Sequence, residues 1–315
     1  MADLMVRQLK QTHPELVPSR AVNINAIKQA NIPLQHKKDL LKLMWQQAGA
    51  VAILSIGQRV QEVEYDPIWR AAMRSDSPEV LFDKWRRFEV FAHSQNRVSI
   101  EQISENKILL HRYTLEGGTP SAPENLLICG LIIALLEKIG CFGLHCEMAC
   151  LDNSKFSIRK NGQFQVPDDI DLLSTAEWSI DWQSFTYQLD KESFGSEDGA
   201  NTLLQSYSAI QNTPIETVVH LLSRDVARAW KVGELARESG LSKRSLQRRL
   251  SDVGLSFSHL IRLVRVHEAC RLLKESAVAI TTVGFCAGFS DSAHFSRDFR
   301  ASMGMTPTDF RDISR

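Results

Sequence analysis

The sequence predicts an α+β N-terminal domain followed by an all-α C-terminal domain in which a long helix joins two helix-turn-helix units. Three observations support this fold class: mixed helix and strand patterns before residue 190, a repeated helix-turn-helix pattern after residue 214, and a difference in charge between the two parts. A length of 315 residues is typical of two domains. We expect these domains over 1–190 and 214–315, separated by a segment over 191–213 that begins as a polar, glycine-containing linker.

The composition is that of an ordinary soluble globular protein, with 43% apolar and 23% charged residues. The net charge of zero hides an uneven distribution. Residues 215–315 hold 16 Lys and Arg against 11 Asp and Glu, whereas residues 1–214 hold 21 against 26. This difference indicates that only the C-terminal part faces a polyanion.

The first 190 residues mix two kinds of pattern. Apolar residues spaced three and four apart predict helices over 37–54, 78–93 and 122–140. Short runs rich in β-branched and aromatic residues predict strands over 108–115, 145–152 and 184–189. Helices and strands in this order predict an α+β domain.

The apolar segments and the cysteines indicate the cellular compartment. The most apolar run, 126–136, is too short to span a bilayer, and the N-terminus lacks the apolar core of a signal peptide. The six cysteines lie inside apolar runs, as reduced, buried thiols do. We expect a cytoplasmic protein with no membrane partner.

After Pro214 the pattern is helical throughout. A first helix is expected from Pro214 to about Trp230, and a short second helix ends at Gly240. Ser242 is a good N-cap for a third helix over 243–253, which buries an apolar stripe. This short helix, glycine turn and capped helix form the first helix-turn-helix.

A long helix over 256–276 comes next and spans roughly 28 Å. The pattern then repeats with a short helix over 279–289, a turn at Gly288 and a capped helix over 292–304. In such units the second helix enters the major groove of DNA. Before the first unit, residues 202–211 predict an amphipathic helix that packs either on a second copy of the chain or on its own domain.

From the short second helix to the C-terminus, the chain resembles the DNA-binding domain of the AraC/XylS family. Two motifs carry the resemblance, namely Gly288, Phe289, Phe295, Arg297 and Phe299, and then Gly304, Pro307, Phe310 and Arg311. One departure is Gly284, where the family usually has alanine. We expect it to weaken its short helix by about 1 kcal/mol without changing a contact.

The resemblance implies which side chains meet DNA. In the first helix-turn-helix the base-reading positions fall on Arg244, Gln247 and Arg248, whose side chains match guanine and adenine edges. Ser242 and Lys243 flank the start of that helix, where Lys243 is expected to meet phosphate. The matching positions in the second unit are Ser292, Ala293, Ser296 and Arg297. Because the first three are small, we expect sequence discrimination to come mainly from the first unit.

The N-terminal domain loosely resembles the regulatory half of some AraC-type regulators, which implies a small-molecule effector. Arg70 with Arg74, and Asp152 with Ser154, resemble the split motif with which PilZ-type receptors hold cyclic diguanylate, although Ser157 stands where glycine is usual. Guanidinium groups grip phosphates, and a carboxylate accepts from guanine. The alternative is a solvated helix face and a turn after a strand. Further candidate effector-binding residues are Arg87, His93 and Arg97.

Other sites are less well supported. Cys141, His145, Cys146 and Cys150 are a potential metal set, but on a strand His145 points away from Cys146 and Cys150, which favours core thiols. We expect no metal, no cofactor and no enzymatic activity.

The sequence therefore predicts a transcriptional regulator whose partners are double-stranded DNA, RNA polymerase and a small-molecule effector. The effector is either cyclic diguanylate or another metabolite. A homodimer through 202–211 is one alternative for the oligomeric state. Two other classes stay open: a regulator controlled by a protein partner, and an Ada-like repair enzyme, which would need metal-clustered thiols.

Overall fold

The computed structural model describes residues 4–8, 34–63, 66–91, 95–187, 201, 203–204, 210 and 213–314. Contacts between Cα atoms divide the chain into two units. The N-terminal unit comprises Met1–Phe82 and His93–Gln188, and the C-terminal unit comprises Asp83–Ala92 and Leu189–Arg315. The short segment Asp83–Ala92 thus belongs to the C-terminal unit, whereas the predicted boundaries place it in the domain over 1–190.

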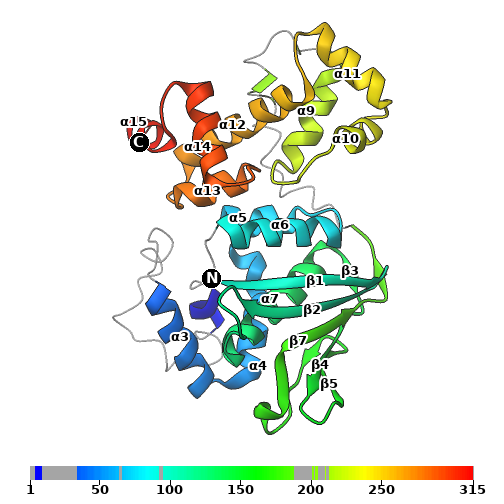
Figure 1. The fold of residues 1–315 in the computed structure, drawn as a ribbon, viewed down its shortest axis with the longest axis vertical. Helices are drawn as coiled ribbons and strands as arrows, with labels where there is room; N and C mark the ends of the chain where they lie inside the picture. The colour runs from blue at the N-terminus through cyan, green and yellow to red at the C-terminus, as the bar shows by residue number, and fades with distance from the viewer. Residues whose placement is uncertain are drawn as a thin grey trace. The chain divides into compact units, whose positions relative to one another are not determined.

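The N-terminal unit contains a six-stranded antiparallel sheet in the order β1-β2-β7-β4-β5-β6 (Figure 1). The strands are β1 (Asn96–Ser104), β2 (Lys107–Thr114), β4 (His145–Cys150), β5 (Lys155–Lys160), β6 (Gln163–Phe164) and β7 (Leu173–Asp181). A second pair joins β3 (Cys141–Phe142) to β8 (Ser184–Phe185). Together with the helices, this sheet confirms the predicted α+β class.

The helices of this unit are α3 (Leu34–Gln47), α4 (Gly49–Leu54), η2 (Ser55–Val63), α5 (Pro67–Met73), α7 (Ala122–Ile139), η3 (Ile170–Leu172) and the first residues of α6 (Pro78–Phe91). The helix predicted over 37–54 is two helices, because Gly49 has φ +76°, which is outside the α-helical range.

The buried helix α7 forms the centre of the N-terminal unit. A capping box between Ser121 and Glu124 begins it, and Gly140 ends it in the left-handed conformation. It packs on β7 and against α4 and η2. The inner face of the sheet contributes buried cross-strand pairs such as Leu110 with Trp178.

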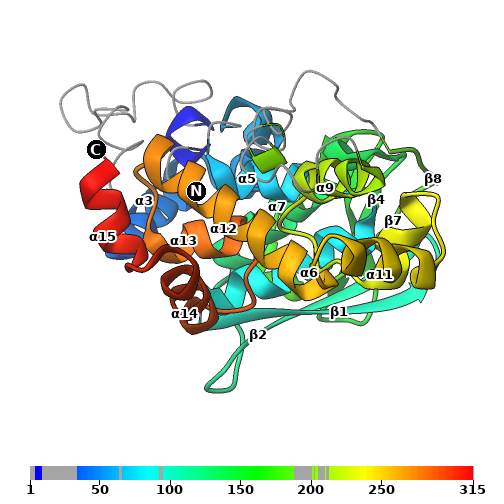
Figure 2. The same ribbon diagram turned by 90° about the horizontal axis from the view of Figure 1, so that it is seen from above.

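In its described residues the C-terminal unit is helical (Figures 1 and 2). Its helices, beside the second half of α6, are α9 (Pro214–Arg224), α10 (Val232–Glu238), α11 (Lys243–Asp252), α12 (Phe257–Glu275), α13 (Ile280–Cys286), α14 (Ser292–Met303) and α15 (Pro307–Ser314). The long helix α12 connects the pair α10–α11 to the pair α13–α14, so the two predicted helix-turn-helix units are confirmed.

Two elements of this unit differ from expectation. The first helix ends at Arg224 and not near Trp230, because Asp225 leaves the helix and the Trp230 indole N–H donates to the Asp225 carbonyl at 3.0 Å. The tail after the second unit forms helix α15, which was not predicted, although Thr306 and Asp309 bond reciprocally as a capping box at its start.

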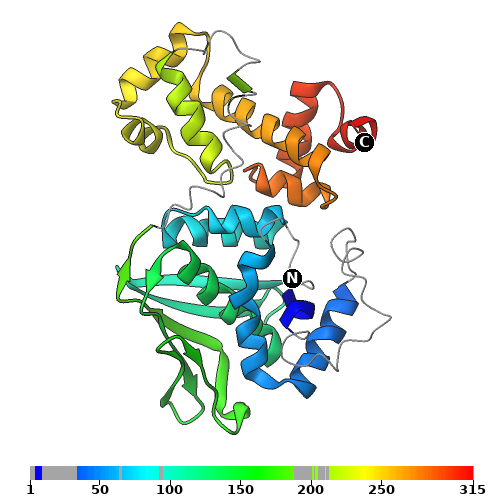
Figure 3. The same ribbon diagram turned by 180° about the vertical axis from the view of Figure 1, so that it is seen from behind.

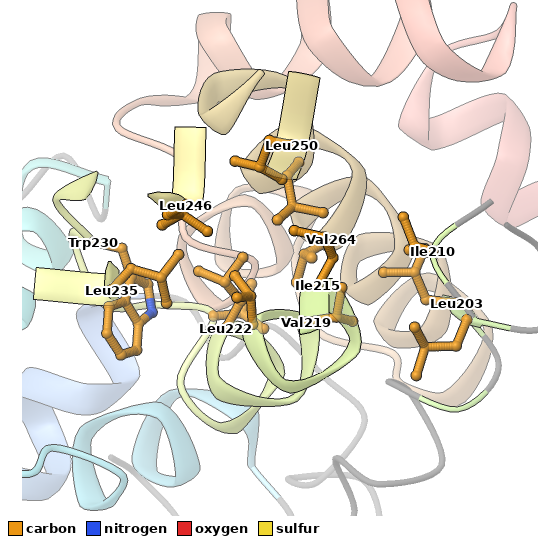
Figure 4. Packing of buried hydrophobic residues seen from close by; sticks show 14 of the residues in the cluster. Leu203, Ile210, Ile215, Val219, Leu222, Trp230, Leu235, Leu246, Leu250 and Val264 are labelled. Atoms are coloured by element: carbon orange, nitrogen blue, oxygen red, sulfur yellow. The ribbon is translucent and has the colours of Figure 1, made fainter. Parts of the chain in front are cut away.

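A hydrophobic cluster surrounds α9 and joins it to α10, α11 and α12 (Figure 4). Leu203, Leu204 and Ile210 belong to this cluster and are almost fully buried in it. Of the two alternatives for 202–211, these three residues favour packing on the chain's own domain. The other residues of 202–211 lie outside the described residues.

Candidate nucleic-acid interface

Helix α11 presents a basic face because its other face is buried. The Ser242 hydroxyl accepts a hydrogen bond from the Ser245 backbone N–H at 3.1 Å and so caps the helix. Leu246 and Leu250 are fully buried. In the first two turns the side chains left exposed are those of Lys243, Arg244, Gln247 and Arg248; Ser251 and Asp252 are exposed at the end of the helix. The first four of these include every base-reading position predicted for the first helix-turn-helix.

Helix α14 is built in the same way but presents a different surface. The Asp291 carboxylate accepts from the His294 backbone N–H at 2.7 Å, while Phe295 and Phe299 are buried. Counted from the N-cap, Arg244, Gln247 and Arg248 correspond to Ala293, Ser296 and Arg297. All three of these positions in α14 are exposed, whereas Ser292 is half-buried.

The hydroxyl of Ser296 is already engaged. It donates to the Ser292 carbonyl one turn earlier, at 3.0 Å. With its one proton used inside the helix and only a short side chain, Ser296 offers little to a base edge. Arg297 is the long exposed donor among the predicted positions of α14.

A polar network that the sequence analysis missed joins α14 to α12. The Asp298 carboxylate lies 3.0 Å from His294 Nε2 and 3.7 Å from Arg262 Nε. Ser290 Oγ lies 2.9 Å from His294 Nδ1. The i, i+4 spacing of His294 and Asp298 is a sequence signal for the first of these contacts. The network orients the start of α14 on the long helix.

Gly284 occupies a tighter position than predicted. A Cβ at this residue would lie 2.7 Å from Cδ1 of Phe295, a buried ring of α14. The expectation that glycine changes no contact here is therefore wrong. The missing side chain makes room for Phe295, so that α13 and α14 pack closely.

The predicted effector residues fall on several elements. Arg70 lies in α5, and Arg74 is the residue that ends it. Asp152 and Ser154 form the turn after β4, where the Asp152 carboxylate accepts from both the hydroxyl and the backbone N–H of Ser154. These bonds hold the pKa of Asp152 below its ordinary value. Figures 1 and 3 place α5 beside α6 and the β4–β5 hairpin away from it, so the structure does not bring the two fragments together.

The remaining candidates are also dispersed. Arg97 lies in β1, and its Nη1 donates to the Asn96 carbonyl at 3.1 Å. Arg87 belongs to the C-terminal unit, where it donates to the Ala227 carbonyl and pairs with Asp83 at 3.0 Å. His93 lies outside the described residues.

The cysteines of β3 and β4 are core residues. Cys146 is fully buried with its sulfur 3.9 Å from that of Cys129, whereas His145 faces the other way, toward Asp181 and Ser157. Burial is the main cause that raises the pKa of the Cys141 thiol to about 12. Across the described residues, no three His, Cys, Asp or Glu side chains are grouped so as to hold a metal ion.

Two helix-turn-helix units, each with an exposed face on its second helix, define a helix-turn-helix domain. A family model described as a helix-turn-helix domain matches residues 235–313. The predicted AraC/XylS type of this domain is confirmed.

Each of the relatives matches about a third of the chain. The HTH-type transcriptional activator FapR of Escherichia coli is 31% identical over 104 residues, which are 33% of this chain and 40% of that protein. The DNA-binding dual transcriptional regulator Rns of Escherichia coli is 27% identical over 95 residues, 30% of this chain and 36% of that protein. A solved transcriptional regulator with an AraC-type DNA-binding domain, from Chromobacterium violaceum, is 25% identical with a TM-score of 0.31 and covers 32% of this chain and 91% of that chain. The chain thus spans about two fifths of the length of the curated relatives it matches. In the part of the chain that the structure describes, no helix is both long and apolar enough to cross a membrane.

Proposed function

We propose that the chain is a sequence-specific DNA-binding transcriptional regulator. The observation that carries this proposal is the exposed basic face of α11, held by a capped N-terminus and two buried leucines. Arginine and glutamine at these positions match base edges, and the neighbouring Lys243 neutralises phosphate. The partners are double-stranded DNA and the RNA polymerase that a regulator recruits or blocks.

The test is selection of duplexes from a randomised library by the full-length protein. Retardation of the selected duplex should weaken steeply with salt, because phosphate contacts release counterions. A scrambled duplex of the same composition is the control. If no duplex is enriched and no salt-sensitive retardation is seen, the proposed function is wrong.

We further propose that the N-terminal unit receives the regulatory signal as a small-molecule effector. Arg70 and Arg74 make cyclic diguanylate the specific candidate, since guanidinium groups bind phosphates bidentately. Asp152 is not needed for this version of the site, because its carboxylate is engaged with Ser154.

Calorimetry of the full-length protein with cyclic diguanylate tests this idea, with Arg70→Ala as the variant and Arg86→Ala as the exposed control. Micromolar binding that Arg70→Ala alone abolishes would support it. Absence of a heat of binding would exclude cyclic diguanylate as the effector. It would not affect the proposal that the chain binds DNA. If a second protein alters DNA binding by the chain and no metabolite does, control by a protein partner is favoured.

A further inference from the structure

Three consecutive residues, Asp225, Val226 and Ala227, lie between α9 and α10, just before the first helix-turn-helix, and we call them the joint. They follow the last residue of α9, where the backbone leaves the helix. Gly288, in the turn of the second helix-turn-helix, approaches the joint so closely that a Cβ would lie 2.1 Å from the Val226 carbonyl oxygen. The turn between α13 and α14 therefore rests directly on the end of α9.

The other two residues of the joint are held by Asp83–Ala92, which belongs to the same unit. Lys84 Nζ lies 2.7 Å from Asp225 Oδ2, and the side chains of the pair are 1% and 10% exposed. One turn further along, Arg87 donates to the Ala227 carbonyl. The Asp83 carboxylate orients Arg87 for this contact at 3.0 Å.

The same segment also reaches the second helix-turn-helix. The rings of Phe88 and Phe91 lie 5.3 and 5.9 Å from the ring of Phe285 in α13. Arg265 of α12 is nearby: burial first, and then the charge of Arg87, lower its pKa to about 10. One short helical segment thus contacts the joint and the second helix-turn-helix.

We propose that Lys84 and Arg87 are positioning residues for DNA recognition, because they lock the joint and so fix α11 relative to α14. This inference rests on the proposed DNA binding. Two recognition helices enter successive stretches of the major groove only if their spacing matches the helical repeat of DNA. A joint that is already rigid avoids the entropic cost of ordering it on the DNA.

The buried ion pair suits this role. Removal of one partner breaks a buried ion pair, which is costly, so the joint would rearrange. A buried pair of charges is also more directional than an apolar contact, because its hydrogen bond fixes both side chains. Lys84 and Asp225 therefore specify one arrangement of the joint.

The experiment uses the full-length chain and the duplex that it selects from a random library. Affinity is measured for that duplex and for versions with one, two or three base pairs inserted between the segments footprinted by α11 and α14. Wild-type protein should lose affinity steeply with each insertion. Lys84→Met should bind the parent duplex about tenfold more weakly and lose less per insertion. Arg86→Met, an exposed change of equal charge on the same helix, should behave as wild type.

Further variants separate positioning from simple stability. Asp225→Asn should copy Lys84→Met, while Lys84→Arg and the reversed pair Lys84→Asp with Asp225→Lys should restore the steep spacing dependence. Thermal melts report folding. Variants that are folded and keep the wild-type spacing dependence would overturn the inference. Variants that unfold would also overturn it, because the ion pair would then contribute to stability alone. If wild-type protein selects no duplex, the proposed function itself fails.

Discussion

Arg248 and Ser296 illustrate how unequal the two recognition helices are at the level of single residues. Arg248 is an exposed, long, bidentate donor, whereas the Ser296 hydroxyl is engaged by the Ser292 carbonyl. A bidentate pair with a base discriminates by about 1–3 kcal/mol. We expect Arg248→Ala to lower affinity and relax preference at one base position, and Ser296→Ala to change little. A base-substitution scan of the selected duplex measures both.

The same scan contains its control. Arg249→Ala removes an equal charge from α11 at a half-buried position, off the predicted reading face, and should weaken binding to all sequences alike. A larger change of base preference for Ser296→Ala than for Arg248→Ala would mean that the second helix-turn-helix is the reader.

Gly284 supports a prediction about stability. A Cβ at this position would lie 2.7 Å from Phe295 Cδ1 and 3.0 Å from its Cγ. Overpacking costs about 1–3 kcal/mol, more than the roughly 1 kcal/mol that alanine gains in helix propensity. Gly284→Ala should therefore lower the free energy of unfolding, measured with urea.

Gly233 is the matched control, because it lies in α10 and a Cβ there would meet nothing within 4 Å. Gly233→Ala should leave stability unchanged or raise it. Equal stabilisation by both substitutions would show that Phe295 moves aside at little cost.

At the scale of a single element, the start of α14 depends on an ionised carboxylate. The hydrogen bond from the His294 backbone N–H is the largest cause that lowers the pKa of Asp291 below its ordinary value of 3.8. A lowered folded-state pKa contributes stability above the unfolded-state pKa, and this contribution is lost as pH falls through the folded-state value. Asp291→Asn retains a capping side chain without a titratable group.

We expect wild type to exceed Asp291→Asn in unfolding free energy at about pH 5, and this difference to shrink at about pH 3. Urea unfolding at the two pH values measures it. A difference that stays constant between them would mean that the cap does not depend on the charge of Asp291.

Element boundaries show where local patterns suffice. Caps and glycine turns correctly predicted α11, α12 and α14, because hydrogen bonds within a few residues decide where these helices begin and end. The end of α9 was predicted six residues too late, since a tertiary contact between Trp230 and Asp225 terminates it. Helix α15 was not predicted although Thr306, Pro307 and Asp309 mark its start; the burial of Phe310 comes from packing against α12 and α14.

At the scale of the whole molecule, the DNA-binding unit is larger than its sequence motif. Leu203, Leu204 and Ile210 are buried in the cluster around α9, and each buried side chain of this kind contributes about 1.5–3 kcal/mol. A fragment over 214–315 should therefore melt at least about 5 °C below a fragment over 201–315. Differential scanning calorimetry of the two fragments measures this, and equal melting temperatures would contradict it.

The sequence by itself determined the class of this protein: an α+β part, two capped helix-turn-helix units on a long helix, and the basic side chains that α11 exposes. These features depend on spacing, capping and charge, which are local. Only the tertiary structure decided which separate segments meet. It placed Lys84 against Asp225, Gly288 against the Val226 carbonyl and Arg70 away from the β4–β5 turn. Contacts between residues far apart in the sequence depend on packing, and no periodicity in the chain encodes them.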